Sequence, residues 1–481
     1  MSPTDVYEFQ NIMRIKTMII MVVTLLTFKI NAQKTLSIAE VIDLTLNNSN
    51  KIKIIENEYK KINIESSFYQ ISLLPKVSAS ISFPYQRSIS EVLQSDGSQK
   101  FIERNFLSPS INLNISQIVP FTGGNFSVTS SLNNNCDFNN KTSNYSSNWA
   151  NISYQQTING FNSYKWNKQL IPLNEKREAI NFLKEKIKLK HEVSKQYAEI
   201  YSIQLKIQLN RLNIDKTEIF LTELEEKFKF GRVLKLDVEQ AKITLEQLKR
   251  QFEMNTLEHT SGIKQLKNTL NIKNDEMYVL EAIEESRYQI DKIALKEAII
   301  KNSFELAKTI KLIELESTID KVKKEGAIAL NLQMGMGLNS ASNNFETLYD
   351  TPAQSQFATI GAKIPILDWG KAKSSYAIAK IEKQNIEYEL EDQEKKIVEQ
   401  IDELSNYHLS LQTQISSLNM QYKLSNSVGE MLFELLKLGR KTIAEYKAQL
   451  VENFNIAIEH QKTINNLYLL KLKIDEITLT L

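Results

Sequence analysis

The residue types that most often carry chemistry are few and scattered in this sequence. The four histidines, at positions 191, 259, 408 and 460, lie far apart, and Cys136 is the one cysteine. None of the histidines has a second histidine or a cysteine at the short spacing that metal ligands take, so a metal site would need a long-range cluster. We find no arrangement of serine, histidine and acid, no phosphate-binding glycine loop and no paired-carboxylate motif above chance. We therefore expect a protein that is not an enzyme and needs no cofactor.

The charge of the chain is balanced. Its 481 residues include 59 Lys and Arg against 57 Asp and Glu, which gives a net charge of +2. Binding to nucleic acid requires a clustered basic surface, so this balance gives no electrostatic reason to expect nucleic acid as a partner.

The amino terminus has the layout of a secretory signal peptide. A basic segment, Met13-Arg14-Ile15-Lys16, precedes a short apolar run over 17–28 and the small residue Ala32. We expect 1–32 to be removed after Ala32, with Met13 as the better start because Asp5 and Glu8 do not suit a signal. No later apolar run reaches the 18 to 20 residues that a membrane-spanning helix requires.

The elements that could position any site are dominated by long helices. From Pro172 to Pro352 there is no proline, and between Gly160 and Gly326 the only glycines are Gly231 and Gly262. Both residue types weaken helices, so their absence favours long ones. A spacing near 3.5 between apolar residues predicts a coiled-coil helix over about 173–229, about 85 Å long, and a return helix to about 272.

Strands are expected before this helical hairpin. Apolar residues alternate with Ser, Asn and Thr near 77–83, 111–116, 126–129 and 151–158, with polar loops expected over about 86–105 and 133–147. Small polar residues on one side and apolar ones on the other suit a membrane barrel, but also a soluble sheet with one wet face. The alternation alone does not distinguish a membrane barrel from a soluble sheet.

The order of elements recurs in the second half of the chain. A helix near 293–324 leads to strands at about 327–366 and then to a helical hairpin over 371–479. The distance from Gly160 to Gly231 is 71 residues and that from Gly370 to Gly439 is 69, which predicts a two-fold internal repeat, 33–292 and 293–481. The first copy has an additional hairpin among its strands at about 77–158.

In this arrangement the chain resembles the TolC-like outer-membrane efflux family over essentially the whole mature sequence. The motifs behind the resemblance are Leu74-Pro75, the exit from the strands at Pro365 to Gly370, and the two helix returns Phe230-Gly231-Arg232-Val233 and Leu438-Gly439-Arg440-Lys441-Thr442. The resemblance implies a mainly α fold with a membrane β-barrel. In it, amphipathic strands and long coiled-coil hairpins from three chains form one α-barrel and β-barrel duct.

The resemblance also implies a function and partners. We expect a homotrimer in the outer membrane, in contact with its lipid and extending into the periplasm, that passively conducts substrates in a tripartite efflux or type I secretion system. Its partners would be a periplasmic adaptor and an inner-membrane pump of the RND, ABC or MFS type. The other hypothesis is a periplasmic coiled-coil adaptor or scaffold. The sequence does not identify the transported substrate. The barrel of a trimer would have 12 strands, or 18 if the additional hairpin joins it.

The family resemblance singles out a small set of residues. Asp237 and Lys441 fall where a periplasmic gate is formed in the family, while Leu436 stands where some members have a gating tyrosine. The helix-turn residues Gly231, Arg232, Gly439 and Arg440 fall where adaptors dock. The alternative, which the residues themselves favour, is that Asp237 and Lys441 are solvated charges at helix starts. Trp369 and Trp166 are candidate anchors at the barrel rim, or tryptophans that fill a corner between strand and helix.

Overall fold

The computed structural model describes residues 34–273 and 276–480. The expected signal segment 1–32, including Met13 and Ala32, lies outside the described residues. The chain divides into two compact units, one of residues 34–53, Lys186–Gln289 and Asn406–Glu476, and one of Ile54–Glu185, Ile290–Ser405 and residues 477–480. None of the helices in these described ranges is both long and apolar enough to cross a membrane.

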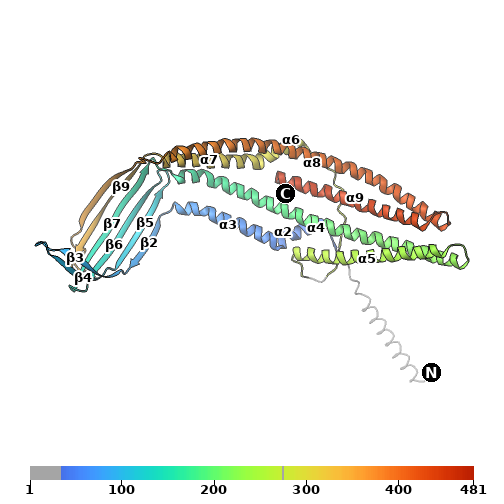
Figure 1. The fold of residues 1–481 in the computed structure, drawn as a ribbon, viewed down its shortest axis with the longest axis horizontal. Coiled ribbons are helices and arrows are strands. Elements are labelled where there is room, and N and C mark those ends of the chain that lie inside the picture. Colours follow the sequence, from blue (N-terminus) through green and yellow to red (C-terminus); the bar gives the residue numbers. More distant parts are fainter. Residues whose placement is uncertain (1–33, 274–275, 481) are drawn as a thin grey trace, which may run out of the picture. The chain divides into compact units, whose positions relative to one another are not determined.

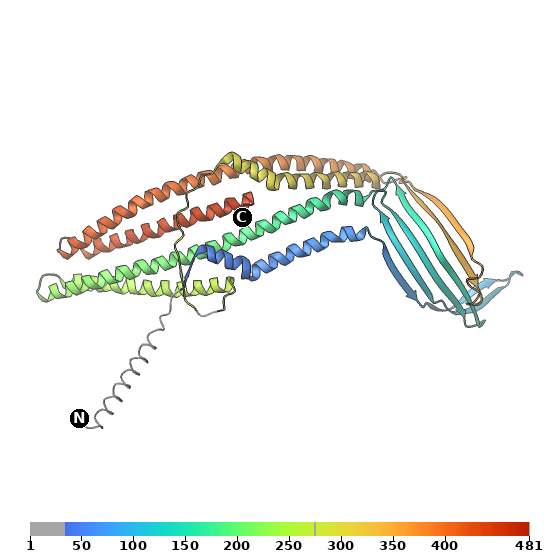
Figure 2. The ribbon, with the colours of Figure 1, turned by 180° about the vertical axis from the view of Figure 1, so that it is seen from behind.

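Long helices make up most of the chain. The helices are α2 (Ile38–Asn48), α3 (Asn50–Ser72), α4 (Ser163–Lys229), α5 (Lys235–Thr269), α6 (Lys292–Ile299), the π-helical turn η1 (Ile300–Phe304), α7 (Glu305–Glu325), α8 (Lys371–Lys437) and α9 (Ile443–Thr478). In the first unit α4 and α5 form one helical hairpin and α8 and α9 form another, and the two helices of each hairpin lie side by side (Figures 1 and 2). α4 and α8 each have 67 residues, about 100 Å at 1.5 Å per residue.

The predicted start of the first long helix needs correction. α4 begins at Ser163 rather than at 173, and it contains Pro172. Its start is fixed by Asn162, whose Oδ1 accepts hydrogen bonds from the backbone N–H groups of Tyr164 and Lys165 at 3.0 and 3.2 Å. This cap lies outside the proline-free stretch on which the prediction rested. Near the amino terminus, Ser49 separates α2 from α3.

The strands of the second unit form one antiparallel sheet. They are β2 (Lys76–Ser82), β3 (Tyr85–Leu93), β4 (Gln99–Leu107), β5 (Ser110–Val119), β6 (Gly124–Asp137), β7 (Thr142–Ile158), β9 (Ala329–Ser342) and β10 (Ala353–Lys363). Six of them pair in the order β2, β5, β6, β7, β9, β10, and the β3–β4 hairpin is attached through two residue pairs between β4 and β6. Figure 1 shows β2, β5, β6, β7 and β9 side by side, and Figure 2 shows the same sheet from behind.

Both polar loop predictions were wrong. The segment 86–105 is mostly the β3–β4 hairpin, which turns at Gly97 with φ +83°. β6 and β7 also extend through most of 133–147, and leave only 138–141 between them. Pairing between strands supplies hydrogen-bond partners to the backbone N–H and C=O groups of these polar segments. They can therefore form strands without an alternating apolar face.

A small element in the first unit had no signal in the sequence. β1 (Lys34–Leu36) pairs in parallel with β8 (Tyr278–Leu280). The side-chain amide of Gln204 in α4 donates to the carbonyl of Leu280 at 2.8 Å and accepts from its N–H at 2.9 Å. The hydroxyl of Tyr197 lies 2.8 Å from the carbonyl oxygen of Leu36. These side chains hold the two short strands against α4.

Candidate functional site at the helical turns

The two turns that join the long helices have the same backbone geometry. Between α4 and α5, the N–H of Gly231 donates to the carbonyl of Phe228 and that of Arg232 to Lys227, both at 2.9 Å. Between α8 and α9, the N–H of Gly439 donates to Leu436 and that of Arg440 to Leu435, also at 2.9 Å. This is the Schellman ending, in which a left-handed residue closes a helix.

The glycines are required by this geometry. φ is +69° at Gly231 and +71° at Gly439, a region that residues with a side chain rarely adopt. No atom would lie within 4 Å of a Cβ added at either position. The constraint is therefore the backbone conformation itself and not crowding.

Each return helix begins with a carboxylate six residues after its glycine. Oδ2 of Asp237 accepts a hydrogen bond from the N–H of Leu234 at 3.2 Å. Oε2 of Glu445 accepts from the N–H of Thr442 at 2.9 Å, and the Thr442 hydroxyl accepts from the N–H of Glu445 at 3.3 Å, which completes a capping box. Each carboxylate therefore satisfies a backbone donor at the start of its own helix.

Lys441 is held by the second of these carboxylates. Its Nζ donates to Oε1 of Glu445 at 2.7 Å. The hydrogen bond from Lys441, followed by those from Thr442, lowers the pKa of the Glu445 carboxyl to about 2. Within the described part of the chain no ion pair joins Asp237 to Lys441. Both residues nonetheless line one hollow of about 800 Å³ between the two turns, together with Arg232.

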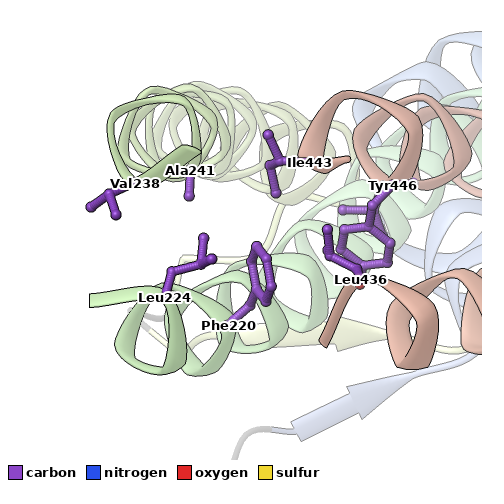
Figure 3. Close-up of a cluster of buried hydrophobic side chains, with 8 residues drawn as sticks. Phe220, Leu224, Val238, Ala241, Leu436, Ile443 and Tyr446 are labelled. Carbon is purple, nitrogen blue, oxygen red and sulfur yellow. The ribbon is translucent and has the colours of Figure 1, made fainter. Parts of the chain in front are cut away.

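A buried apolar cluster packs the two hairpins together behind the turns. Its side chains come from α4, α5, α8 and α9 and gather behind the turns (Figure 3). α4 contributes Phe220 and Leu224, α5 Val238 and Ala241, α8 Leu436, and α9 Ile443, Tyr446 and Leu450. Leu436 is 5% exposed and Tyr446 2% exposed. Burial raises the pKa of the Tyr446 hydroxyl to about 12.

The cluster shows what Leu436 and Tyr446 do in this chain. Leu436, at the position where some members of the resembled family have a gating tyrosine, contributes to an apolar core rather than to a polar contact. Tyr446 belongs to the same core, and its ring lies 5.2 Å from that of Phe433 in helix α8. Its helical spacing from Ile443 and Leu450 was the available signal.

The turns also carry exposed side chains. Phe230 and Leu438 each precede the turn glycine and are 79% and 69% exposed. Arg232 and Arg440 follow the glycines and are also exposed. Each turn thus displays one exposed apolar and one exposed cationic side chain beside a hydrogen-bonded turn, a combination that could bind a protein partner.

The two tryptophans named from the sequence differ in their environments. Trp369, with φ +56°, is 89% exposed in the turn between β10 and α8. Next to it, the Oδ2 of Asp368 accepts from the N–H of Ala372 at 2.9 Å, and such backbone hydrogen bonds lower the pKa of the Asp368 carboxyl. Trp166 is half-buried in the first turn of α4, and its Nε1 donates to Asp320 at 3.1 Å. Exposure therefore suits Trp369 better than Trp166 to an anchoring role.

Comparison with known proteins gives matches in structure alone. No family profile and no curated protein sequence matches the chain. Among solved structures, CusC, described as forming a transmembrane channel, aligns with a TM-score of 0.65 and 12% identity over 92% of this chain and 91% of its own. The outer membrane channel CmeC of Campylobacter jejuni gives 0.65 and 14% over 92% and 85%. The open state of the MtrE outer membrane channel of Neisseria gonorrhoeae gives 0.60 and 12% over 92% and 88%.

Proposed function

From its TolC-like fold, we propose that this chain is the outer-membrane channel component of a tripartite efflux or type I secretion system. It would lie in the outer membrane, extend into the periplasm and conduct substrates passively. The observation that carries the proposal is the combination of an amphipathic antiparallel sheet with two helical hairpins that end in the same turn. The low identity of the matched structures leaves the substrate open.

The sheet supports a role in the membrane as part of a closed barrel. β2 and β10 are the outermost of the six strands that pair along their length, and each has one ladder partner in the described part of the chain, β5 and β9 respectively. In lipid every backbone donor and acceptor must be paired, so these two edges have to meet strands of other copies. A homotrimer in which β2 of one copy pairs with β10 of the next satisfies both edges.

The helical turns support docking to a periplasmic adaptor, which would connect the channel to an inner-membrane pump of the RND, ABC or MFS type. Phe230 and Leu438 supply exposed apolar contacts at the two turns, and Arg232 and Arg440 supply positive charge. An adaptor with a helical tip of matching apolar and acidic character would complement both turns.

A gate at the turns remains part of the proposal. In a single chain Asp237 caps α5 and Lys441 binds Glu445. A gating contact would therefore form between Asp237 of one chain and a cation of another, or would replace these local bonds when the channel closes. The position of both residues on one hollow favours such an exchange.

The alternative is a periplasmic coiled-coil adaptor or scaffold, in which the sheet would be a soluble domain. The purified mature protein distinguishes the two functions. A channel should be recovered from the outer-membrane fraction as a detergent-dependent trimer that dissociates on heating, and should cross-link to an adaptor and a pump. A water-soluble monomer would refute the channel and favour the scaffold.

A further inference from the structure

The sheet has more strands than the two-fold repeat requires. The second half of the chain supplies one hairpin, β9–β10, whereas the first half supplies β2, β5, β6 and β7 to the same sheet. The question is whether the middle pair, β5 and β6, belongs to the membrane wall or forms a domain outside it. The register of the sheet bears on this question.

Two adjacent rows of side chains cross all six strands. Because neighbouring residues in a strand point to opposite faces, each row marks one face of the sheet. The apolar row consists of Val77, Ile115, Val128, Ile152 and Met336 and ends in Gln356. The polar row beside it consists of Ser78, Asn114, Thr129, Asn151, Gly337 and Ser355. Neither row changes character at β5 or β6.

The apolar row is exposed in the single chain. Val77 at one end is 66% exposed and Met336 near the other is 64% exposed, and between them Ile115 and Ile152 are exposed and Val128 is half-buried. A soluble domain would cover such a face with other parts of the chain, because contiguous exposed apolar area is costly in water. Lipid is the occupant that suits an uncovered face continuous over six strands.

The distribution of charge separates these six strands from the β3–β4 hairpin. The six strands contain three charged residues, Lys76, Asp137 and Lys363, and each stands at the end of its strand. β3 and β4 contain five within two strands of nine residues, namely Arg87, Glu91, Lys100, Glu103 and Arg104. Charges on a lipid-facing strand are costly at the middle of the membrane, so only the six strands have a composition that fits it.

We infer that all six strands, including β5 and β6, form the lipid-facing wall, and that the β3–β4 hairpin lies outside the membrane. This inference rests on the proposed function. In a trimer, six strands per chain give a barrel of 18 strands rather than 12. At a strand spacing of about 4.8 Å and a tilt of about 40°, the backbone cylinder is about 36 Å across instead of about 24 Å. The polar row of Ser, Asn, Thr and Gly then lines an uncharged pore.

A wall without β5 and β6 would require a different pairing. β5 pairs with β2 through seven residue pairs, Lys76–Ser82 with Ser110–Ser116, and β6 pairs with β7 from Asn125 to Asp137. Removing the middle pair from the sheet would break both ladders and would require β2 to pair directly with β7. The backbone groups released in this way would each need a new partner.

Cysteine labelling in isolated outer membranes tests the inference. In a Cys136→Ser background, Thr129→Cys and Val128→Cys place a thiol on the polar and the apolar face of β6. Asn151→Cys and Ile152→Cys are the matched pair on β7, which belongs to the wall under either strand count. A sulfonated maleimide reacts with the hydrated thiolate and not with a thiol held in hydrocarbon. Labelling after denaturation in detergent reports the total thiol, and heat-modifiable trimers report folding.

We expect Thr129→Cys to be labelled at least tenfold faster than Val128→Cys, with the same contrast between Asn151→Cys and Ile152→Cys. A contrast on β7 with equal labelling on β6 would overturn the inference and leave the channel intact. Equal labelling at both pairs would overturn the inference and the proposed membrane location together. Ile89→Cys in β3 should be labelled freely although Ile89 is apolar, and protection there would refute the outside position of the hairpin.

Discussion

Replacing Leu436 by alanine should loosen both helical turns at once. Leu436 is 5% exposed within the cluster that joins the four helices behind the turns. Deleting a buried leucine side chain costs about 2 to 5 kcal/mol, the sum of lost burial and the cavity that remains. At about 1.4 kcal/mol per factor of ten, a middle value of about 3 kcal/mol raises the opening constant of the packed turns by more than about a hundredfold.

Leu438→Ala is the matched control. It removes the same side chain two residues further along, where Leu438 is 69% exposed in the turn, and should change stability by less than about 0.5 kcal/mol. The assay is amide hydrogen exchange of the folded protein, followed by mass spectrometry of peptides that cover the two turns. Leu436→Ala should accelerate exchange around Gly439 and also around Gly231 on the other hairpin.

The effect on the other hairpin decides whether the reasoning holds. The side chain of Leu436 comes from α8, so a change confined to α8 and α9 would mean that the cluster does not couple the two hairpins. Equal exchange rates in Leu436→Ala and Leu438→Ala would mean that burial of the side chain at position 436 does not stabilise the packed turns. Either result would refute the account of the cluster given above.

The remaining predictions concern the turns. Gly439→Ala should cost about 1 to 2 kcal/mol through its positive φ alone, whereas Gly439→Asn should cost less because asparagine tolerates this conformation, as the same exchange assay can measure. Asp237→Lys should raise single-channel conductance and drug sensitivity if the gate exists, and Glu239→Lys, the same charge change outside the hollow, should not. Thr442→Ala should cost about 1 kcal/mol by loss of the cap. Because the folded pKa of Glu445 is depressed to about 2, its contribution is present above its ordinary value of 4.5 and should disappear as the pH falls toward 2. The measurement is the protection of the amides at the start of α9, each rate being divided by the intrinsic rate of that amide at the same pH, and this protection should fall. Unchanged conductance in Asp237→Lys would remove the gate, and protection that does not change with pH would remove the role assigned to Glu445.

The long helices were predictable because their determinants are local. The scarcity of proline and glycine and the spacing of apolar residues act within a few turns, and the breaks at Gly231 and Gly439 were visible as glycines in otherwise helical stretches. The start of α4 was missed because a single cap, Asn162, outweighed the proline that follows it. Proline in a helix removes one hydrogen bond, and a long helix can compensate for that loss.

The strands were predictable only where one face meets an apolar environment. β5 alternates strictly, whereas the β3–β4 hairpin carries charges and was interpreted as a loop. Its conformation depends on pairing between the two strands, for example Glu91 opposite Phe101, and on the turn at Gly97. β1 and β8 depend on partners more than 240 residues apart in the sequence. Such long-range pairing leaves no periodic pattern in either segment.

The residues at the turns show why a gate is harder to derive than a fold. Asp237 and Glu445 both stand six residues after a left-handed glycine, and both accept a backbone hydrogen bond at the start of a helix. This local requirement is sufficient to explain an acid at each position, so the presence of Asp237 cannot by itself indicate a gate. In the proposed channel, a role in closure would depend instead on a cation of another chain opposite Asp237, which would be a property of the assembly. What a single sequence can identify is the turn that places the carboxylate on the hollow.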